Sequence, residues 1–133
     1  MAKPNPATLD EEWLRIKSGL MSQVHESLGS VAMLRQDFTG AEESFRTAIE
    51  VADKPTGVKF FRLGQSLMRQ GRYDKALEAA DRSVEAGGLR RSDGQDLALL
   101  LKEDIERAKR AGTQAAPAPS DPLEPKVEVG SQP

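Results

Sequence analysis

The sequence offers few side chains that could carry out chemistry. Its one histidine, His25, is the most versatile of them, because an imidazole can act as a base or bind a metal near neutral pH. The absence of cysteine excludes disulfides and thiolate metal sites, and a single histidine excludes a multi-histidine site. The acidic cluster Asp10–Glu12 stands at a predicted helix start, where carboxylates favour the helix dipole. The sequence therefore predicts no enzyme, no metal site and no cofactor.

Charge and hydropathy limit the kinds of partner that the chain could bind. Its net charge of −2 is too close to neutral for general nucleic-acid binding, and Arg90-Arg91 is too short a basic stretch. No apolar run approaches the roughly 18 residues that a membrane-spanning helix needs. The polar, proline-containing start lacks the apolar segment of a secretory signal. We therefore expect a cytoplasmic protein with a protein partner, without nucleic-acid binding and without membrane insertion.

The hydrophobic pattern of the N-terminal part predicts amphipathic helix. Thr8–Glu11 has the form of a capping box, in which a hydroxyl and a carboxylate satisfy free amides at a helix start. The apolar residues that follow at helical intervals of three and four are Trp13, Ile16, Leu20, Val24, Leu28 and Val31. Residues 9–36 form either one helix or two helices that break near Ser18-Gly19. We favour one helix, because a lone glycine costs only about 1 kcal/mol relative to alanine.

Two further helices are predicted in the middle of the chain. Thr39–Glu42 is a second capping box, from which we expect a helix that extends to about Ala52. The turn that follows ends at Thr56, which is expected to cap a helix over residues 57–70. Gly71 should end that helix, because glycine adopts the left-handed conformation that other residues resist.

Glycines separate the last two predicted helices. The first of them runs from about Asp74 to Ala86 and stops at Gly87-Gly88. Ser92–Gln95 is a third capping box, which opens a helix over residues 93–111, and Gly112 closes it. This last helix is apolar on one face and charged on the other, so we expect it to pack on one side only.

These elements define one helical domain over residues 8–112. Residues 1–7 are expected to form a disordered lead-in. Over residues 113–133 the composition changes to alanine, proline and serine, and the prolines oppose helix formation. We therefore predict a disordered tail or linker in this C-terminal part.

The chain repeats itself once, at an interval of 35 residues. Small and aromatic residues recur at the same offsets: Leu28, Gly29, Phe38, Ala41 and Ala48 are matched by Leu63, Gly64, Tyr73, Ala76 and Ser83. A period of this length is typical of stacked helix–turn–helix units. Proteins built in this way usually present a surface to a partner.

This pattern resembles the tetratricopeptide repeat, which runs Trp-x2-Leu-Gly-x2-Tyr in its first helix and Ala-x3-Phe in its second. The copies here read His25-x2-Leu28-Gly29-x2-Ala32 with Ala41-x3-Phe45, and Phe60-x2-Leu63-Gly64-x2-Leu67 with Ala76-x3-Ala80. The resemblance implies an all-α, right-handed solenoid of helical hairpins, with repeats at about 22–53 and 57–88 and a capping helix at 93–111. It also implies a non-catalytic scaffold or adaptor that binds a protein or peptide. His25 stands where the family has an aromatic residue, and we interpret it as a core residue.

In this family the first helices of the repeats line a concave groove. Beside the packing stripe of helix 57–70 lies a second stripe bordered by two arginines, and subtracting one period carries it onto the preceding first helix. The candidate peptide-binding residues are Val58, Phe61, Arg62, Gln65, Met68 and Arg69 in the second repeat, with Met33, Ser30 and Glu26 in the first. Such a surface would suit a peptide with acidic and apolar residues. Glu26 and Ser30 argue against the carboxylate clamp of chaperone-binding members.

Other interpretations of the same residues stay open. Phe61 and Met68 are equally compatible with burial, in which case the two arginines only face solvent. Two repeats are fewer than the roughly three that a stable stack normally needs. This shortage favours an alternative function, in which the protein associates with itself or with a larger complex through its end faces, using Trp13 or helix 93–111. Trp13 itself is interpreted as a core residue, with an exposed docking residue as the alternative.

Overall fold

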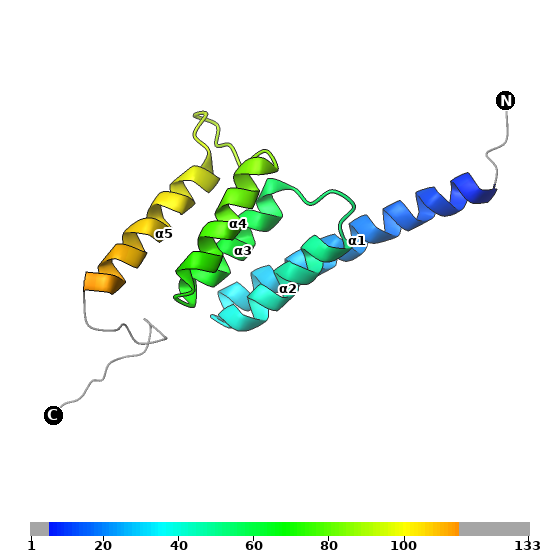
Figure 1. Cartoon of the computed structure of the whole chain (residues 1–133). Helices are drawn as coiled ribbons and strands as arrows, with labels where there is room; N and C mark the ends of the chain where they lie inside the picture. The colour runs from blue at the N-terminus through cyan, green and yellow to red at the C-terminus, as the bar shows by residue number, and fades with distance from the viewer. Residues whose placement is uncertain (1–5, 115–133) are drawn as a thin grey trace.

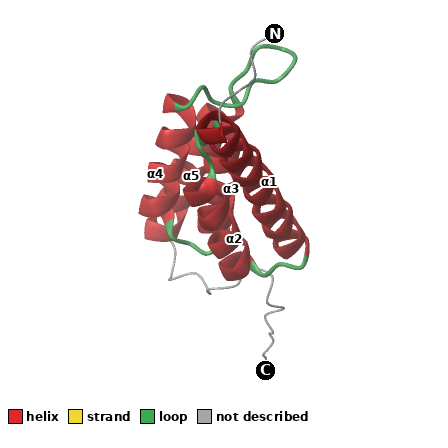
Figure 2. Cartoon of the chain, turned by 90° about the vertical axis from the view of Figure 1, so that its right-hand side faces the viewer, coloured by secondary structure: helices red, strands yellow, loops and turns green. Residues whose placement is uncertain are grey.

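Five helices make up residues 6–114, which are the part of the chain that the structure, a computed structural model, describes (Figure 1). They are α1 (Pro6–Leu34), α2 (Phe38–Val51), α3 (Gly57–Arg69), α4 (Tyr73–Glu85) and α5 (Leu97–Gln114). Each helix packs on the next, and α5 also touches α3. The helices therefore form a row of antiparallel hairpins (Figure 1 and Figure 2). The predicted all-α architecture of helical hairpins is confirmed.

The N-terminal helix α1 is a single continuous helix of 29 residues. No neighbouring atom lies within 4 Å of the place where a Cβ on Gly19 would be, so no packing contact interrupts the helix there. The helix begins at Pro6 and not at the predicted cap Thr8, because proline has no amide that would need a partner in the first turn. The predicted boundary of the lead-in 1–7 is therefore wrong. Residues 1–5 lie outside the described part.

The starts of α2 and α3 differ from the predicted capping pattern. The carboxylate of Asp37 caps α2 by accepting a hydrogen bond of 3.0 Å from the Gly40 amide. The predicted box Thr39–Glu42 therefore lies inside the helix, since an aspartate two residues earlier already satisfies the free amide. Thr56 directly precedes α3 as predicted, but its side chain makes no capping hydrogen bond. Gly71 adopts the expected left-handed conformation, with φ of 77°.

The last helix α5 begins at Leu97, four residues later than predicted. Asp96 is the residue that caps it, since its carboxylate accepts hydrogen bonds from the amides of Ala98 at 2.9 Å and Leu89 at 3.0 Å. The bond from Leu89 is the largest cause of a lowered pKa of Asp96. The box at Ser92–Gln95 belongs to the loop before α5. At its other end the helix runs through Gly112 to Gln114, so the predicted stop is also wrong. Residues 115–133 of the predicted tail lie outside the described part.

The turns inside the two hairpins share their backbone geometry at the predicted interval of 35 residues. Gln36 in the turn between α1 and α2 has φ of 63°, and Gly71 in the turn between α3 and α4 has φ of 77°. The next amide in each turn reaches back to the first helix: Asp37 N donates to Ala32 O at 2.8 Å, and Arg72 N donates to Leu67 O at 3.0 Å. Glutamine pays a steric cost in this conformation that glycine avoids. The two turns are therefore equivalent structures built from different residues.

One buried serine joins the two helices of each hairpin by a hydrogen bond. The hydroxyl of Ser22 in α1 donates to the carbonyl of Ala48 in α2 at 2.7 Å. The hydroxyl of Ser83 in α4 donates to the carbonyl of Gly57 in α3, also at 2.7 Å. Positions 22 and 57 are one period apart, as are positions 48 and 83. The same two positions are thus joined in each hairpin, with donor and acceptor exchanged.

The small residues of the repeat lie where helices approach closely, as predicted. Gly29 and Gly64 are buried, and Ala41 and Ala76 have no exposed surface at all. A Cβ on Gly29 would overlap the ring of Phe45, so only glycine allows this contact between α1 and α2. The core of the molecule therefore lies along the seams within and between the hairpins.

Candidate functional site

The second-repeat candidates lie together on α3, between the buried stripe of that helix and solvent. Their side chains are partly exposed, whereas Leu63, Ser66 and Leu67 on the same helix are buried. The six candidates on this surface of α3 are Val58, Phe61, Arg62, Gln65, Met68 and Arg69. Phe61 and Met68 also pack against the core cluster. These two apolar side chains are thus anchored in the core and keep part of their surface accessible.

An ion-pair cluster brings Glu26 of the first hairpin to this surface. One oxygen of Glu26 is 3.0 Å from Lys59 Nζ, and the other is 3.1 Å from Arg62 Nε. The Glu26 and Lys59 side chains are only 19% and 15% exposed, whereas Arg62 is 42% exposed. One carboxylate faces two cations here, so the cluster carries a net positive charge. Partial burial strengthens its field relative to a fully solvated surface.

Arg69, the second candidate arginine, is held against an aromatic ring. Its guanidinium carbon lies 4.5 Å from the centre of the Phe38 ring, at the start of α2. A cation over an aromatic face gains on the order of 0.5–1 kcal/mol at an exposed site. Both candidate arginines are therefore positioned by residues of the first hairpin, Arg62 by an ion pair and Arg69 by a ring.

The remaining candidates on α1 are less closely connected to α3. Met33 packs against the same core cluster as Phe61 and Met68. Ser30 is half-buried, and no hydrogen bond within residues 6–114 joins it to a candidate on α3. The structure thus gathers Glu26, Met33 and the α3 residues around the junction of α1 and α3, with Ser30 apart from the polar contacts.

Two charged residues at the junction between hairpins were missed by the sequence analysis. Lys59 is one of them, because its partner Glu26 lies 33 residues away and only the packing of the two hairpins, through α2 and α3, brings them together. The other is Glu42, which is 8% exposed. One oxygen of Glu42 accepts from Arg72 Nη1 at 2.6 Å and Gln70 at 3.0 Å, and the other accepts from Arg46 at 2.8 Å. Its counterpart one period later is the apolar Leu77, and this mismatch was the available signal.

The charge state of Glu42 follows from these contacts. Burial raises the pKa of its carboxyl, but the hydrogen bonds from Arg46 and Gln70 and the charges of Arg72 and Arg46 outweigh burial. The net result is a pKa below the ordinary value of 4.5. Glu42 is therefore an ionised link between α2 and the turn that joins α3 to α4.

The apolar stripe of α1 lies on the outside of the molecule. Trp13 is 62% exposed, so its interpretation as a core residue is wrong. The row that Trp13 belongs to, whose other members are between 45% and 85% exposed, also contains Leu9, Ile16, Leu20, Val24, Leu28, Val31 and Leu34. Leu14 and Met21 are exposed as well, but they lie beside this row. His25 is only partly buried, so it is not a full core residue either. The reason is the close contact of α1 with α2, which requires small residues such as Ser22 and Gly29 on the inner side.

A shallow cavity of about 280 Å³ lies on another surface, where α2, α3 and α4 meet. Ile49, Phe60 and Leu63 contribute its apolar part. Arg82 also lines it, with its guanidinium carbon 5.6 Å from the centre of the Phe60 ring. The sequence analysis did not predict this cavity, because its lining comes from three helices.

Two kinds of site were searched for in the described part of the chain, a cluster of metal ligands and a membrane-spanning helix. Within residues 6–114, no group of three or more histidine, aspartate or glutamate side chains could hold a metal ion. No helix in the same range is long and apolar enough to cross a membrane. Glu26, Lys59 and Arg62 place charge on the surface of α3 that also carries the partly exposed Phe61.

Comparison with known protein families identifies the second hairpin. The family model of the tetratricopeptide repeat matches residues 59–86, which cover most of α3 and all of α4. Comparisons with curated proteins and with solved structures give no match. The first hairpin shares with the matched one the left-handed turn residue, the buried serine hydrogen bond and a buried glycine at the same repeat position. The second hairpin therefore matches the tetratricopeptide repeat, and the first hairpin is similar to the second in these features.

Proposed function

We propose that the protein is a non-catalytic scaffold that binds a peptide segment of a partner protein across the surface formed by α1 and α3. Its repeat family supports a role in protein–protein interaction in general. The observation that carries the finer proposal is the positively charged cluster of Lys59, Arg62 and Glu26 beside the partly exposed Phe61. Charge and apolar surface at one place are what an extended or helical peptide needs for recognition.

The chemistry of the cluster indicates a peptide with an acidic residue next to an apolar one. Arg62 uses its Nε atom for Glu26, which leaves its two terminal nitrogens to donate to a carboxylate of the peptide. Phe61 and Met68 offer apolar contact, and the flexible thioether of methionine adapts to different side chains. Because Glu26 and Phe38 already hold the two arginines, little side-chain entropy is lost on binding.

Charge reversal of the two arginines tests this proposal. The double variant Arg62→Glu/Arg69→Glu should lose most of its capture of binding proteins from a native lysate, because two donors to the acidic residue become repulsive. The matched control is Arg107→Glu/Arg110→Glu, which makes the same change in net charge on exposed positions of α5. Circular dichroism and thermal unfolding of both variants would show whether the fold is kept. Unchanged capture by a folded Arg62/Arg69 variant would contradict the proposal.

A second candidate function is assembly with a larger complex through an end face of the stack. The observation that favours it is the exposed apolar stripe on α1, which includes Trp13 and Leu20 at 62% and 60% exposure. Soluble monomers rarely expose a contiguous apolar patch of this extent unless another molecule covers it. A substitution such as Leu20→Glu should abolish assembly and leave peptide capture unchanged, whereas the Arg62/Arg69 reversal should do the opposite.

A further inference from the structure

Helix α1 has small and polar residues on the side that faces the protein and large apolar residues on the side that faces solvent. Its inner side, toward α2, carries small and polar residues such as Ser22 and Gly29, both of which are buried. Its outer side carries a continuous row of large apolar residues that runs from Leu9 to Leu34. A surface helix normally does the reverse. The outer row therefore needs a cover that residues 6–114 do not supply.

The repeat shows which kind of cover is missing. Leu63 on α3 is 6% exposed, whereas its counterpart Leu28 on α1 is 52% exposed. Likewise, Ser66 is fully buried, while its counterpart Val31 is 45% exposed. On α3 the neighbours α2, α4 and α5 surround these positions, whereas within residues 6–114 no helix before α1 takes the place that α2 has before α3. The outer row of α1 is thus the face on which a further helix would pack.

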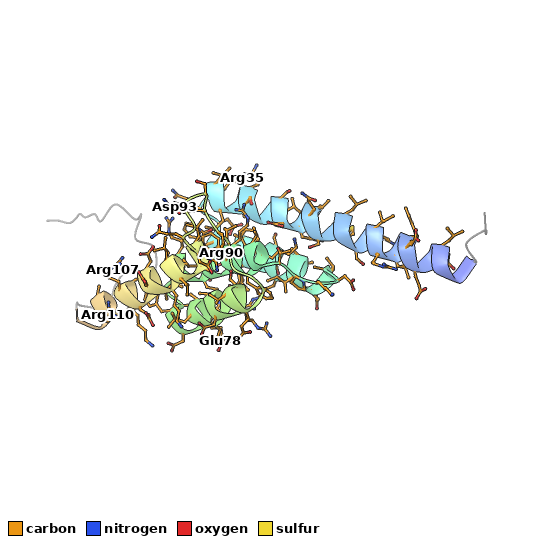
Figure 3. All side chains as sticks on the ribbon, turned by 90° about the horizontal axis from the view of Figure 1, so that it is seen from above. Arg35, Glu78, Arg90, Asp93, Arg107 and Arg110 are labelled. Carbon is orange, nitrogen blue, oxygen red and sulfur yellow. The ribbon has the colours of Figure 1, made fainter. Side chains whose placement is uncertain are left out.

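Within residues 6–114, the N-terminal half of α1 has no helix packed against it that would stabilise it. Residues 9–21 are exposed almost throughout, and this part of the helix projects beyond the other four (Figure 1 and Figure 3). An isolated helix of about 12–15 residues is only marginally stable in water. Packing of another helix along the apolar row would stabilise this half by burying Trp13, Ile16 and Leu20.

The row is large enough for a stable interface between two proteins. It contains eight large apolar side chains, each about half exposed or more. Together they offer an apolar area on the order of 800 Å², which is close to what one partner buries in a stable complex. Two copies that covered each other along this row would therefore bury an interface of standard size.

The opposite end of the stack is not a suitable partner for the row. Helix α5 has one exposed large apolar residue, Leu99, and its outer face also carries exposed charges such as Glu103, Asp104 and Arg110. Packing α1 of one copy on α5 of the next would bury those charges without partners, which is costly. A head-to-tail filament is therefore disfavoured. The alternative for two identical copies is that the outer rows of both α1 helices pack on each other across a two-fold axis.

The spacing of the row suits such two-fold pairing. From Trp13 to Val31 the intervals between its members are three, four, four, four and three residues. This series reads the same in both directions, with its centre at position 22. An antiparallel second copy would therefore place its Val31 opposite Trp13, its Leu28 opposite Ile16 and its Val24 opposite Leu20.

The charges at the two ends of the row agree with the same register. Asp10 lies near the N-terminal end of the row and is exposed, as is Arg35 just beyond its C-terminal end; Figure 3 labels Arg35 at that end of α1. In the antiparallel arrangement each Asp10 would come close to Arg35 of the second copy. A parallel arrangement would instead place like charges side by side.

We propose that the outer face of α1 is a homodimer interface, on which α1 of a second copy packs antiparallel, with the two-fold axis passing between Leu20 and Val24 of the outer row. This proposal rests on the second candidate function, assembly through an end face, and is independent of the peptide surface. It names the partner as another copy of the chain and fixes its direction and register.

Sedimentation equilibrium of the full chain between about 1 and 100 μM would test the proposal. We expect a reversible dimer, with a shift of Trp13 fluorescence to shorter wavelength as the dimer forms. Leu20→Glu should weaken association at least about 100-fold, because each interface would bury two unpaired carboxylates. The matched control Leu14→Glu changes a residue of the same helix that is equally exposed, 59% against 60%, but lies outside the row. It should change the dissociation constant less than about threefold.

Cysteine cross-linking would test the direction of pairing, since the chain has no cysteine of its own. A mixture of Asp10→Cys and Leu34→Cys should form a mixed disulfide, and neither variant alone should cross-link, because like positions would lie on the order of 35 Å apart. Cross-linking of each variant with itself would overturn the antiparallel register. A parent chain that stays monomeric at the highest concentration would overturn the homodimer. If Leu20→Glu then abolished binding to a different protein, assembly through the end face would still hold.

Discussion

Helices α1 and α3 occupy the same place in two successive repeats but differ in what surrounds them. Helix α3 lies between α2 and α4 and also touches α5, so its stripe around Leu63 and Leu67 is buried. Helix α1 packs on α2 along one side, and its opposite face is open. The difference shows that a repeat position alone does not determine burial. Burial is determined by whether a neighbouring helix covers the position. Contacts between neighbouring repeats are also the source of much of the stability of stacked repeats.

The largest expected effect concerns the buried glycine that both helices carry at the same repeat position, Gly29 in α1 and Gly64 in α3. Gly29→Ala should lower the free energy of unfolding by about 3 kcal/mol, because the added Cβ overlaps the buried ring of Phe45. Gly64→Ala should cost far less, since its nearest neighbour is the flexible end of Leu101 at 3.1 Å. Urea denaturation of both variants would measure the difference. Equal losses in the free energy of unfolding would contradict the prediction that Gly29 is packed more tightly than Gly64.

The next effect concerns the link between the first hairpin and the second. Glu42→Ala should lower the free energy of unfolding by about 2 kcal/mol, because it leaves Arg46 and Arg72 without their shared carboxylate. Glu43→Ala is the matched control, since Glu43 is the exposed neighbour of Glu42 on α2. Its effect should stay within about 0.5 kcal/mol. Urea denaturation of the two variants side by side would measure both effects, and equal effects would contradict the role of Glu42.

The pH dependence of stability gives a second measurement of the same link. The pKa of Glu42 in the folded protein lies below its ordinary value of 4.5. The stability that this carboxylate contributes is therefore complete above 4.5 and is lost as the pH falls through its folded pKa. Glu42→Gln should show a shallower loss of stability in acid than the parent. Parallel curves of the two proteins below pH 4.5 would contradict this assignment.

A smaller, matched effect is expected from the two buried serines. Ser22→Ala and Ser83→Ala should each cost about 1 kcal/mol, because each leaves a buried carbonyl without its hydrogen bond. The two values should agree closely if the hairpins are equivalent. Thermal unfolding monitored by circular dichroism would compare them. A clear loss in Ser83→Ala with none in Ser22→Ala would indicate that the first hairpin is more loosely packed than the second.

The smallest expected effect lies in the projecting part of α1. Gly19→Ala should raise the helix content and stabilise the protein by about 0.5–1 kcal/mol, since no neighbouring atom would contact the new Cβ. Circular dichroism at a low protein concentration would detect the change. A destabilised variant would reveal a close contact at Gly19 that the isolated chain does not make.

The hairpins themselves could be predicted from the sequence, because their signals are local or repeat at a fixed interval. Gly29 and Gly64, or Ala41 and Ala76, recur at one period and are small for a reason that applies at each site. Helix starts were predicted less well. Several residues that can cap lie close together, as Asp37 and Thr39 do, and the backbone geometry selects one of them.

The surface of the candidate site could be predicted only in part, because it depends on which helices meet. The stripe on α3 followed from the helical repeat, but the pairing of Glu26 with Lys59 and Arg62 depends on how the two hairpins pack through α2 and α3. The outward orientation of Trp13 could not be predicted from the sequence either. An apolar row shows that a helix face favours burial, but it does not show whether the same chain provides the covering helix.

Hydrogen exchange of the parent protein at low and high concentration would test the central claim most directly, since it compares α1 and α3 in one experiment. Residues 57–69 should be protected at every concentration, because α2, α4 and α5 already cover α3. Residues 9–21 should exchange rapidly in dilute solution and become protected as the concentration rises and a second helix covers the apolar row. Rapid exchange of residues 9–21 at all concentrations would contradict the account, and so would exchange of residues 57–69 as fast as that of residues 9–21.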